Sequence, residues 1–197
     1  MKTEAFLAIP IMLLLSSEIQ AQDWYIGTSY GVAIPVSDTK LFTDHTSWRN
    51  WGVDVLAVLR PSTSVGVSFS WNVFNDDTTT VSSFDRVDVG GTQFRYINSL
   101  PILANVRQYA GRPGGVRPFV GLGVGAQLVK QRVDISQWRI EDDTWHFAVA
   151  PELGIVLQGS DAKWIINGKY HFAAKASDRK HSYFGIYFGI AVQTGRY

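Results

Sequence analysis

The chain has 197 residues and a formal net charge of +1 at pH 7; 46% of its residues are hydrophobic and 18% are charged. This composition, with a mean hydropathy of zero, excludes both a polytopic helical membrane protein and a disordered chain. The balanced charge argues against nucleic acid as a partner, and the absence of cysteine excludes a disulfide framework, a thiolate metal site and a lipoprotein anchor.

The chain begins with the pattern of a secretory signal peptide. Lys2 precedes the apolar run 5–15, and a polar stretch then leads to Ala21, which predicts cleavage directly after that residue. The apolar run is shorter than the roughly 20 residues that a membrane-spanning helix needs. We therefore expect residues 1–21 to be a cleaved signal peptide and residues 22–197 to form one exported domain.

Eight later segments alternate between apolar and polar residues, which is the period of a β-strand with one apolar face. The segments cover residues 24–35, 51–60, 65–73, 94–107, 120–128, 145–157, 163–172 and 183–193. Pro101 and Pro151 fall within two of them. We expect each proline to mark a bulge, because proline lacks the backbone N–H that a strand ladder needs.

The connections between these segments alternate in length. Long connections cover residues 37–50, 75–92, 133–143 and 176–180. Tight turns cover residues 61–64, 110–117 and 158–161. The sequence therefore predicts an all-β fold, an eight-stranded antiparallel up-and-down barrel with the termini and turns at one end and the long connections at the other.

Alternation alone leaves open which face lies inside. In a soluble lipocalin-like barrel the apolar face surrounds an apolar ligand, whereas in an outer-membrane barrel it faces lipid. Glycines gather on the polar face, as a narrow lumen requires, and aromatic residues on the apolar face gather at the strand ends, as at two bilayer interfaces. The predicted aromatic girdle comprises Trp24, Trp51, Trp71, Trp145, Trp164 and Phe184. We predict a transmembrane barrel, with a secreted soluble barrel as the alternative.

The polar face also carries charges of both signs in mid-strand. They are Asp54, Arg95, Arg107, Glu152 and Lys169. A turn near residue 160 would place Lys169 level with Glu152 on the neighbouring strand, so we expect these charges to form ion pairs inside the lumen. Because the side chains of an eight-stranded barrel fill its interior, a general diffusion pore is disfavoured.

Several stretches resemble the small outer-membrane β-barrel domain family, which includes the OmpA membrane domain and OmpX. These are LPILANVR at 100–107, RPFVGLGVG at 117–125, NGKYHF at 167–172 and the closing alternation at 183–192. The resemblance implies the outer membrane of a Gram-negative bacterium, with outer-membrane lipid and lipopolysaccharide as partners. In this architecture long loops face outward and short turns face the periplasm.

The resemblance also assigns a role to the end of the chain. Proteins of this family usually end on an aromatic residue that the barrel-assembly machinery recognises, and Tyr197 matches at the last position. Gln193 and Gly195 stand where the family has hydrophobic residues. Either a bulge near Thr194 shifts the register, or recognition is weaker here.

The function predicted from these features is non-enzymatic: a structural, adhesive or protective role through the extracellular loops, with no cofactor and a possible extracellular ligand. The alternative is an enzyme that modifies lipid A or phospholipid. A deacylase of that kind presents His-x-Ser on its lipid-facing rim, but here alanine follows in the stretch His171-Phe172-Ala173, which lacks the nucleophile.

No metal site is predicted either. The four histidines, which show no metal-ligand spacing and are expected at different heights, are His45, His146, His171 and His181. The long connections hold 11 of the 15 acidic residues that remain after signal cleavage. We interpret these as solvated loop residues, with calcium binding or bridging to lipopolysaccharide through divalent ions as the alternative.

Overall fold

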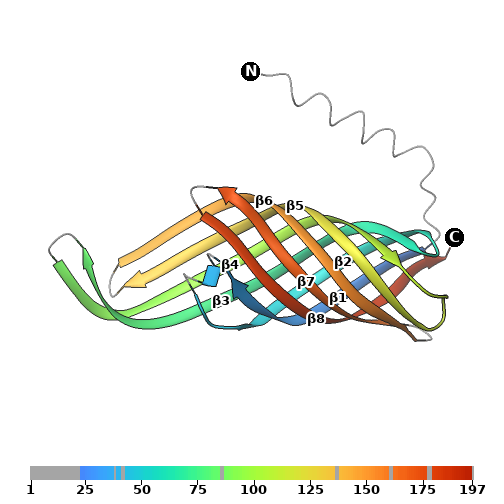
Figure 1. Cartoon of the computed structure of the whole chain (residues 1–197), viewed down its shortest axis with the longest axis horizontal. Helices are drawn as coiled ribbons and strands as arrows, with labels where there is room; N and C mark the ends of the chain where they lie inside the picture. The colour runs from blue at the N-terminus through green and yellow to red at the C-terminus, as the bar shows by residue number, and fades with distance from the viewer. Residues whose placement is uncertain are drawn as a thin grey trace, which may run out of the picture.

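The computed structural model is a closed barrel of eight antiparallel strands, in which β8 pairs with β1 (Figure 1). The structure describes residues 23–37, 39–40, 43–84, 87–135, 138–159, 162–176 and 179–196, with the backbone alone at 76–84, 87–95, 133, 135, 138–140, 179 and 195–196. The strands are β1 (Asp23–Val36), β2 (Ser47–Arg60), β3 (Thr63–Phe84), β4 (Val87–Tyr109), β5 (Val116–Ile135), β6 (Trp138–Gln158), β7 (Ala162–Ala176) and β8 (Arg179–Arg196). The predicted fold class and strand count are confirmed.

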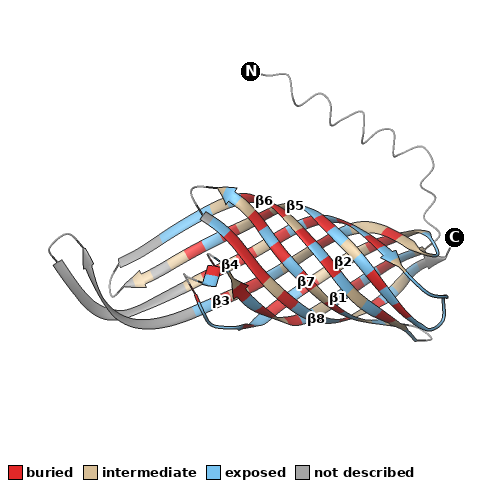
Figure 2. Cartoon of the chain, in the orientation of Figure 1, coloured by how far each residue is buried: buried red, intermediate tan, exposed pale blue. Residues whose placement is uncertain are grey.

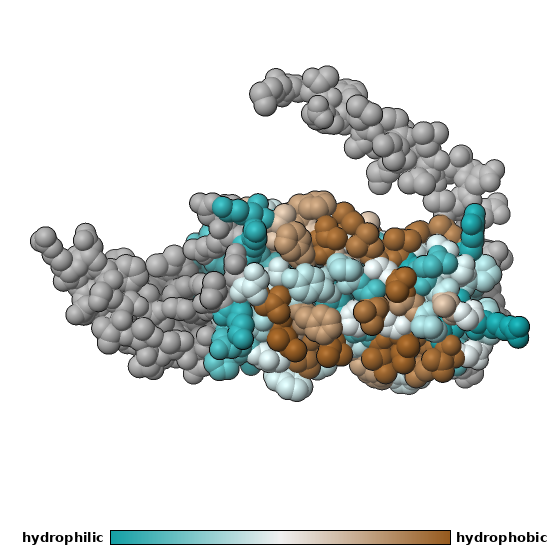
Figure 3. All heavy atoms as spheres, viewed as in Figure 1, coloured by the Kyte–Doolittle hydropathy of each residue, from teal (hydrophilic) through white to brown (hydrophobic). Residues whose placement is uncertain are grey.

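Burial alternates along the strands and settles which face lies inside. Buried and exposed positions follow one another along each ribbon in the barrel wall (Figure 2). The exposed members are large and apolar, among them Val120, Leu153 and Phe188. Hydrophobic patches cover much of the visible face of the barrel wall (Figure 3). The apolar face therefore points outward, as a barrel in lipid requires. This overturns the soluble lipocalin-like alternative, whose apolar face would point inward.

Three of the four expected long connections are strand for most of their length; in the one over 176–180, β7 ends at Ala176 and β8 begins at Arg179. In place of a connection over residues 75–92, β3 continues to Phe84 and β4 begins at Val87. In place of a connection over 133–143, β5 continues to Ile135 and β6 begins at Trp138. The apolar alternation of the barrel strands does not run through residues 75–92, whereas in the β5–β6 hairpin Val133 pairs with Ile140 and Ile135 with Trp138.

The prediction of bulges at the two prolines is wrong. The β3–β4 ladder lacks pairs at Pro101 but has the same register at Phe69↔Ile102 and Asn72↔Ser99, on either side of it. The β6–β7 ladder is likewise interrupted at Pro151 without a shift. Each proline removes pairs on one side only, and its strand remains paired with the other neighbour.

A register shift does occur where the sequence departs from its family pattern. The β1–β8 pairing shifts between Asp23↔Arg196 and Tyr25↔Gln193, which places an irregularity at residues 194–195 of β8. Tyr197 itself lies outside the described residues, as does the segment 1–22 with the expected signal peptide. None of the described residues forms a helix long and apolar enough to cross a bilayer.

Candidate functional site

Arg107 on β4 is the centre of a charge cluster in the lumen. Its side chain is 1% exposed. Its Nε donates to Glu152 Oε1 at 2.5 Å, and its Nη2 donates to Glu152 Oε2 at 3.1 Å and to Asp54 Oδ2 at 2.8 Å. The ring of Phe119 lies 5.2 Å from the guanidinium carbon. Two-point binding of a carboxylate is the strongest arrangement open to a guanidinium, so Arg107 and Glu152 hold each other in fixed positions.

Two side chains of β7 complete the cluster. Lys169 Nζ lies 3.4 Å from Glu152 Oε2, and Asn167 Nδ2 donates to the same oxygen at 3.1 Å. The cluster thus contains two carboxylates and two cations, and its formal charge is zero. Burial of an unpaired charge in a low-dielectric interior costs roughly several kcal/mol, because the ion loses its hydration. The zero net charge of the cluster therefore allows four charged side chains to be buried together.

A glycine allows the central contact to form. Arg107, Gly121, Glu152 and Lys169 lie in one row across β4, β5, β6 and β7, since each is the register partner of the next. Arg107 and Glu152 are therefore two strands apart, with Gly121 between them. A Cβ atom at Gly121 would lie 2.5 Å from Glu152 Oε1. Any larger residue there would occupy the space in which the carboxylate meets the guanidinium.

A second layer of buried side chains lies nearer the end with the long hairpins. Asn72 Nδ2 donates to the hydroxyl of Tyr183 at 2.8 Å, and the hydroxyl of Tyr187 donates to Asn72 Oδ1 at 3.1 Å. The ring of His171 stacks on Tyr183 with centroids 4.4 Å apart. The neighbouring apolar cluster consists of Ala33, Phe74, Ile97, Val129 and Tyr183. Strand alternation does not predict this layer, because it marks the inner face only as polar.

The two layers leave little free space in the middle of the barrel. A cavity of about 20 Å³ lies beside Asp54 and Lys169, and one of about 10 Å³ lies beside His146 and His181. A single water needs about 10–15 Å³. A larger cavity, of about 250 Å³, lies at the turn end beside Arg117. The described side chains therefore close the lumen to solutes larger than water.

Of the five predicted lumenal charges, the structure brings four together and leaves one apart. The backbone of Arg95 pairs with Asp76 on β3 and with Val133 on β5. It lies twelve residues along β4 from Arg107, which at about 3.3 Å per residue is roughly 40 Å. Arg95 therefore does not join the cluster. Arg95 was predicted in the lumen because it continues the apolar–polar alternation of β4, but at this residue β4 already lies beyond the barrel wall.

The four long strands form a sheet that continues past the barrel rim (Figure 1). The β2–β3 pairing ends at Val73 and the β6–β7 pairing at Ala148, whereas β3–β4 and β5–β6 pair up to their turns. The β4–β5 pairing continues to Gln93↔Ile135, at the end of β5. From Val73 to Phe84, β3 extends by about 35 Å. Lys130 and Asp143 are register partners at the base of this sheet, and their charged groups lie 3.0 Å apart. We call the part of β3–β6 beyond these points the extended sheet.

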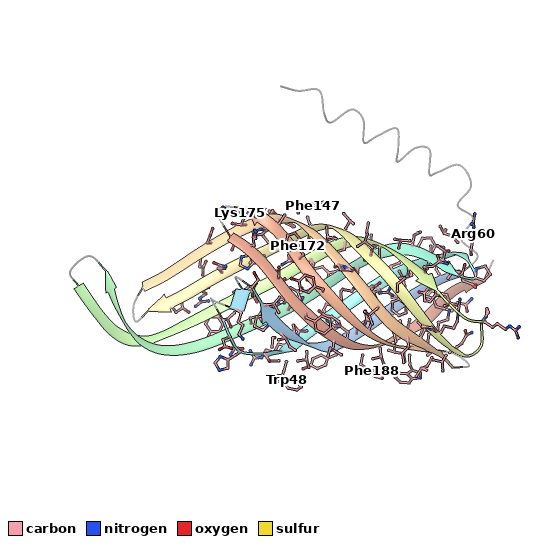
Figure 4. All side chains as sticks on the ribbon, in the orientation of Figure 1. Trp48, Arg60, Phe147, Phe172, Lys175 and Phe188 are labelled. Atoms are coloured by element: carbon pink, nitrogen blue, oxygen red, sulfur yellow. The ribbon has the colours of Figure 1, made fainter. Side chains whose placement is uncertain are left out.

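The predicted girdle residues lie on the outer surface of the barrel. Trp24 and Trp164 are exposed near the turn end, and Trp51, Trp71 and Trp145 are exposed nearer the extended sheet; Phe184 is half-buried. The indole nitrogens of Trp51 and Trp71 donate to Thr28 and Asn98. Four further exposed aromatic side chains are labelled in Figure 4. These are Trp48, Phe147, Phe172 and Phe188. Three of them stand on the apolar faces that the sequence predicted, and Trp48 falls in the expected connection 37–50.

The histidines are arranged differently from the prediction. His146 and His181 do not lie at different heights, because their rings meet edge to face with centroids 5.2 Å apart. His171 is buried in the lumen rather than on the lipid-facing rim, where a deacylase would need it. Among the described residues, no group of three or more histidine, cysteine or acidic side chains is placed to hold a metal ion.

Solved structures with the same architecture include Neisserial surface protein A, at a TM-score of 0.60 and 11% identity, covering 87% of this chain and 97% of that one. OprG of Pseudomonas aeruginosa aligns at a TM-score of 0.54 and 14% identity, covering 88% of this chain and 96% of that one. The attachment invasion locus protein Ail of Yersinia pestis aligns at 0.50 and 13% identity, covering 87% and 97%. The fold is that of the small outer-membrane β-barrels.

This likeness agrees with the outward apolar face and its aromatic ends, and together they place the barrel in the outer membrane. No family model matches the sequence, and no curated protein matches it either. At these identities the similarity is one of fold.

Proposed function

We propose that this protein is a non-enzymatic surface protein, whose barrel anchors the extended sheet outside the cell for a structural, adhesive or protective role. The observation that carries the proposal is the combination of a closed lumen with four strands that continue beyond the rim. Strands that only cross a bilayer need about 9–11 residues, and β4 has 23. The additional length serves no purpose in the membrane and supports a role for this sheet in the medium.

The proposal assigns partners to each end of the molecule. Outer-membrane lipid and lipopolysaccharide would surround the girdle, and the barrel-assembly machinery would recognise the end of β8 with Tyr197. The Ail structure contains a heparin analogue, sucrose octasulfate. In this chain the four long connections contain 11 acidic and 6 basic residues, so a polyanion of that kind is disfavoured here. We propose an uncharged or basic partner at the extended sheet.

The proposal is tested by shortening the sheet while the barrel is kept. Phe74 and Ile97 are register partners, so residues 75–96 can be replaced by Asn-Gly, the preferred two-residue hairpin turn. Lys130 and Asp143 are also partners, so residues 131–142 can be replaced in the same way. A retained heat-modifiable gel shift would show that the shortened barrel still folds in the outer membrane.

Cells with the shortened protein are then compared with cells that have the full chain, in adhesion to host surfaces and in survival in serum. We expect loss of adhesion or serum survival from the shortened variant and no conductance from either protein in planar bilayers. Equal behaviour of both strains in both assays, or a stable open channel from the full chain, would contradict the proposal.

A further inference from the structure

The cavity of about 250 Å³ at the turn end has no part in the proposed surface role. Its lining includes the turn residues Pro61 and Pro113 and none of the four charged residues of the charge cluster. Its walls are in part apolar, with Leu56, Val156 and Ile165 among the lining residues. This volume falls just below the roughly 300–1,000 Å³ of pockets that hold drug-sized ligands. An occupant would therefore be a small molecule with an apolar body.

Two cations line this cavity, and each is held against an aromatic ring. Arg117 is 8% exposed. Its guanidinium carbon lies 5.0 Å from the ring centroid of Tyr109, and its Nη2 donates to the carbonyl of Pro61 at 2.5 Å. Lys163 Nζ lies 3.5 Å from the ring centroid of Tyr25. Both cations are thereby fixed in place, and Lys163 lies within electrostatic reach of both Arg117 and Asp23.

These cations differ from those of the charge cluster in their partners. Arg107 and Lys169 each form an ion pair with a carboxylate. Within the described part of the chain, neither Arg117 nor Lys163 has a carboxylate within ion-pair distance. The buried Nε of Arg117 also lacks a hydrogen-bond partner there. This Nε has almost no accessible surface, so a ligand in the cavity would meet the Arg117 side chain as a cation rather than through this donor.

We propose that this cavity binds a small amphiphilic monocarboxylate. Its carboxylate would pair with the guanidinium of Arg117 and the ammonium of Lys163, while a short alkyl or aryl body would cover Leu56 and Val156. Asp23 also lines the cavity and accepts from Gln193. The local charge of two cations and one carboxylate is therefore +1, which one monoanion neutralises. A dianion such as a phosphate monoester would leave an excess of negative charge.

The test uses the full-length barrel in nanodiscs of zwitterionic lipid, to which hexanoate is added in steps. Binding is followed by the NMR signals of Arg117 Nε–H and of the backbone amides around the cavity. 1-Hexanol supplies the same body without the charge, and acetate supplies the charge without the body. We expect saturable shifts with hexanoate and much weaker binding of the other two. Arg117→Gln should weaken hexanoate binding at least about ten-fold, because it removes a charge-assisted hydrogen bond.

Arg60→Gln is the matched control, since Arg60 is an exposed cation at the same end of the barrel and does not line the cavity (Figure 4). Its binding of hexanoate should be unchanged. If Arg117→Gln fails to show the heat-modifiable gel shift, Lys163→Gln is expected to give the same weakening. The proposal is overturned if hexanoate causes no saturable shift, if hexanol binds as tightly, or if Arg60→Gln weakens binding as much as the variants that line the cavity. None of these results bears on the extended sheet.

Discussion

Replacement of Glu152 by glutamine tests whether the charge cluster stabilises the barrel. Glutamine keeps the volume of the side chain and can still accept from Asn167. It removes the negative charge that Arg107 meets at 2.5 Å and Lys169 at 3.4 Å. Asp54 then remains as the one carboxylate of the cluster against two buried cations. Loss of one partner from a buried ion pair typically costs about 3–5 kcal/mol, and we expect the free energy of unfolding to fall by a value in this range.

The measurement is urea-induced unfolding from lipid vesicles, followed by tryptophan fluorescence and by the heat-modifiable shift on a gel. Asp143→Asn is the control, because the Lys130–Asp143 pair has a similar distance, 3.0 Å, but its side chains are 48% and 52% exposed. An exposed pair contributes at most about 1 kcal/mol. If both variants lose the same free energy, or Glu152→Gln loses less than the control, the cluster is not a stabilising element.

A double-mutant cycle then isolates the pair of Glu152 and Lys169. Lys169→Met removes the ammonium and keeps the apolar stem, so it should relieve part of the excess positive charge that Glu152→Gln leaves behind. Directly coupled residues show interaction energies of about 0.5–3 kcal/mol. We therefore expect the double variant to be more stable than the sum of the two single effects. A strictly additive result would show that the 3.4 Å contact contributes nothing.

Two further expectations concern the membrane face and the orientation. Phe188→Arg places a charge on the exposed, lipid-facing side of β8. It should lower the free energy of unfolding in lipid by about 2–4 kcal/mol, the cost of a cation near the bilayer midplane. Gln193→Arg, whose side chain lies beside Asp23, should cost much less. Equal losses for the two would mean that the outer face is wrongly assigned. An epitope inserted at Asp77 in the extended sheet should be labelled by antibody on intact cells; labelling of permeabilised cells alone would reverse the orientation.

The barrel could be predicted because the wall of a barrel in lipid requires a regular pattern of residues along each strand. The two faces of each strand meet different surroundings, so apolar and polar residues must alternate. The pairing of Lys169 with Glu152 on the neighbouring strand could also be predicted, since a tight turn fixes the register of the two strands that it joins. Arg95 shows where this reasoning fails, because alternation alone does not tell where a strand leaves the membrane.

Contacts across the lumen could not be predicted in the same way. Arg107 touches Asp54 from a strand two positions away around the barrel, and the relative height of such strands depends on the sum of all registers between them. The layer around Asn72 and Tyr183 depends on the same sum. The cavity beside Arg117 and Lys163 depends on it as well. A single sequence gives each register only within about a residue, and these uncertainties add up around the barrel.

Gly121 is the position at which this long-range geometry can be tested by one methyl group. Gly121→Ala would place Cβ 2.5 Å from Glu152 Oε1, whereas Gly123→Ala would place it at the same distance from the neutral Asn105 Oδ1. Alanine is favoured over glycine in a strand by about 0.5–1 kcal/mol, so Gly123→Ala should be nearly neutral once Asn105 moves aside. At Gly121 the carboxylate can move only by leaving Arg107, and we expect a loss approaching that of Glu152→Gln. In the Glu152→Gln background the same substitution should cost far less, because the ion pair is already broken. If Gly121→Ala costs the same in both backgrounds, the glycine is not what brings Arg107 and Glu152 together.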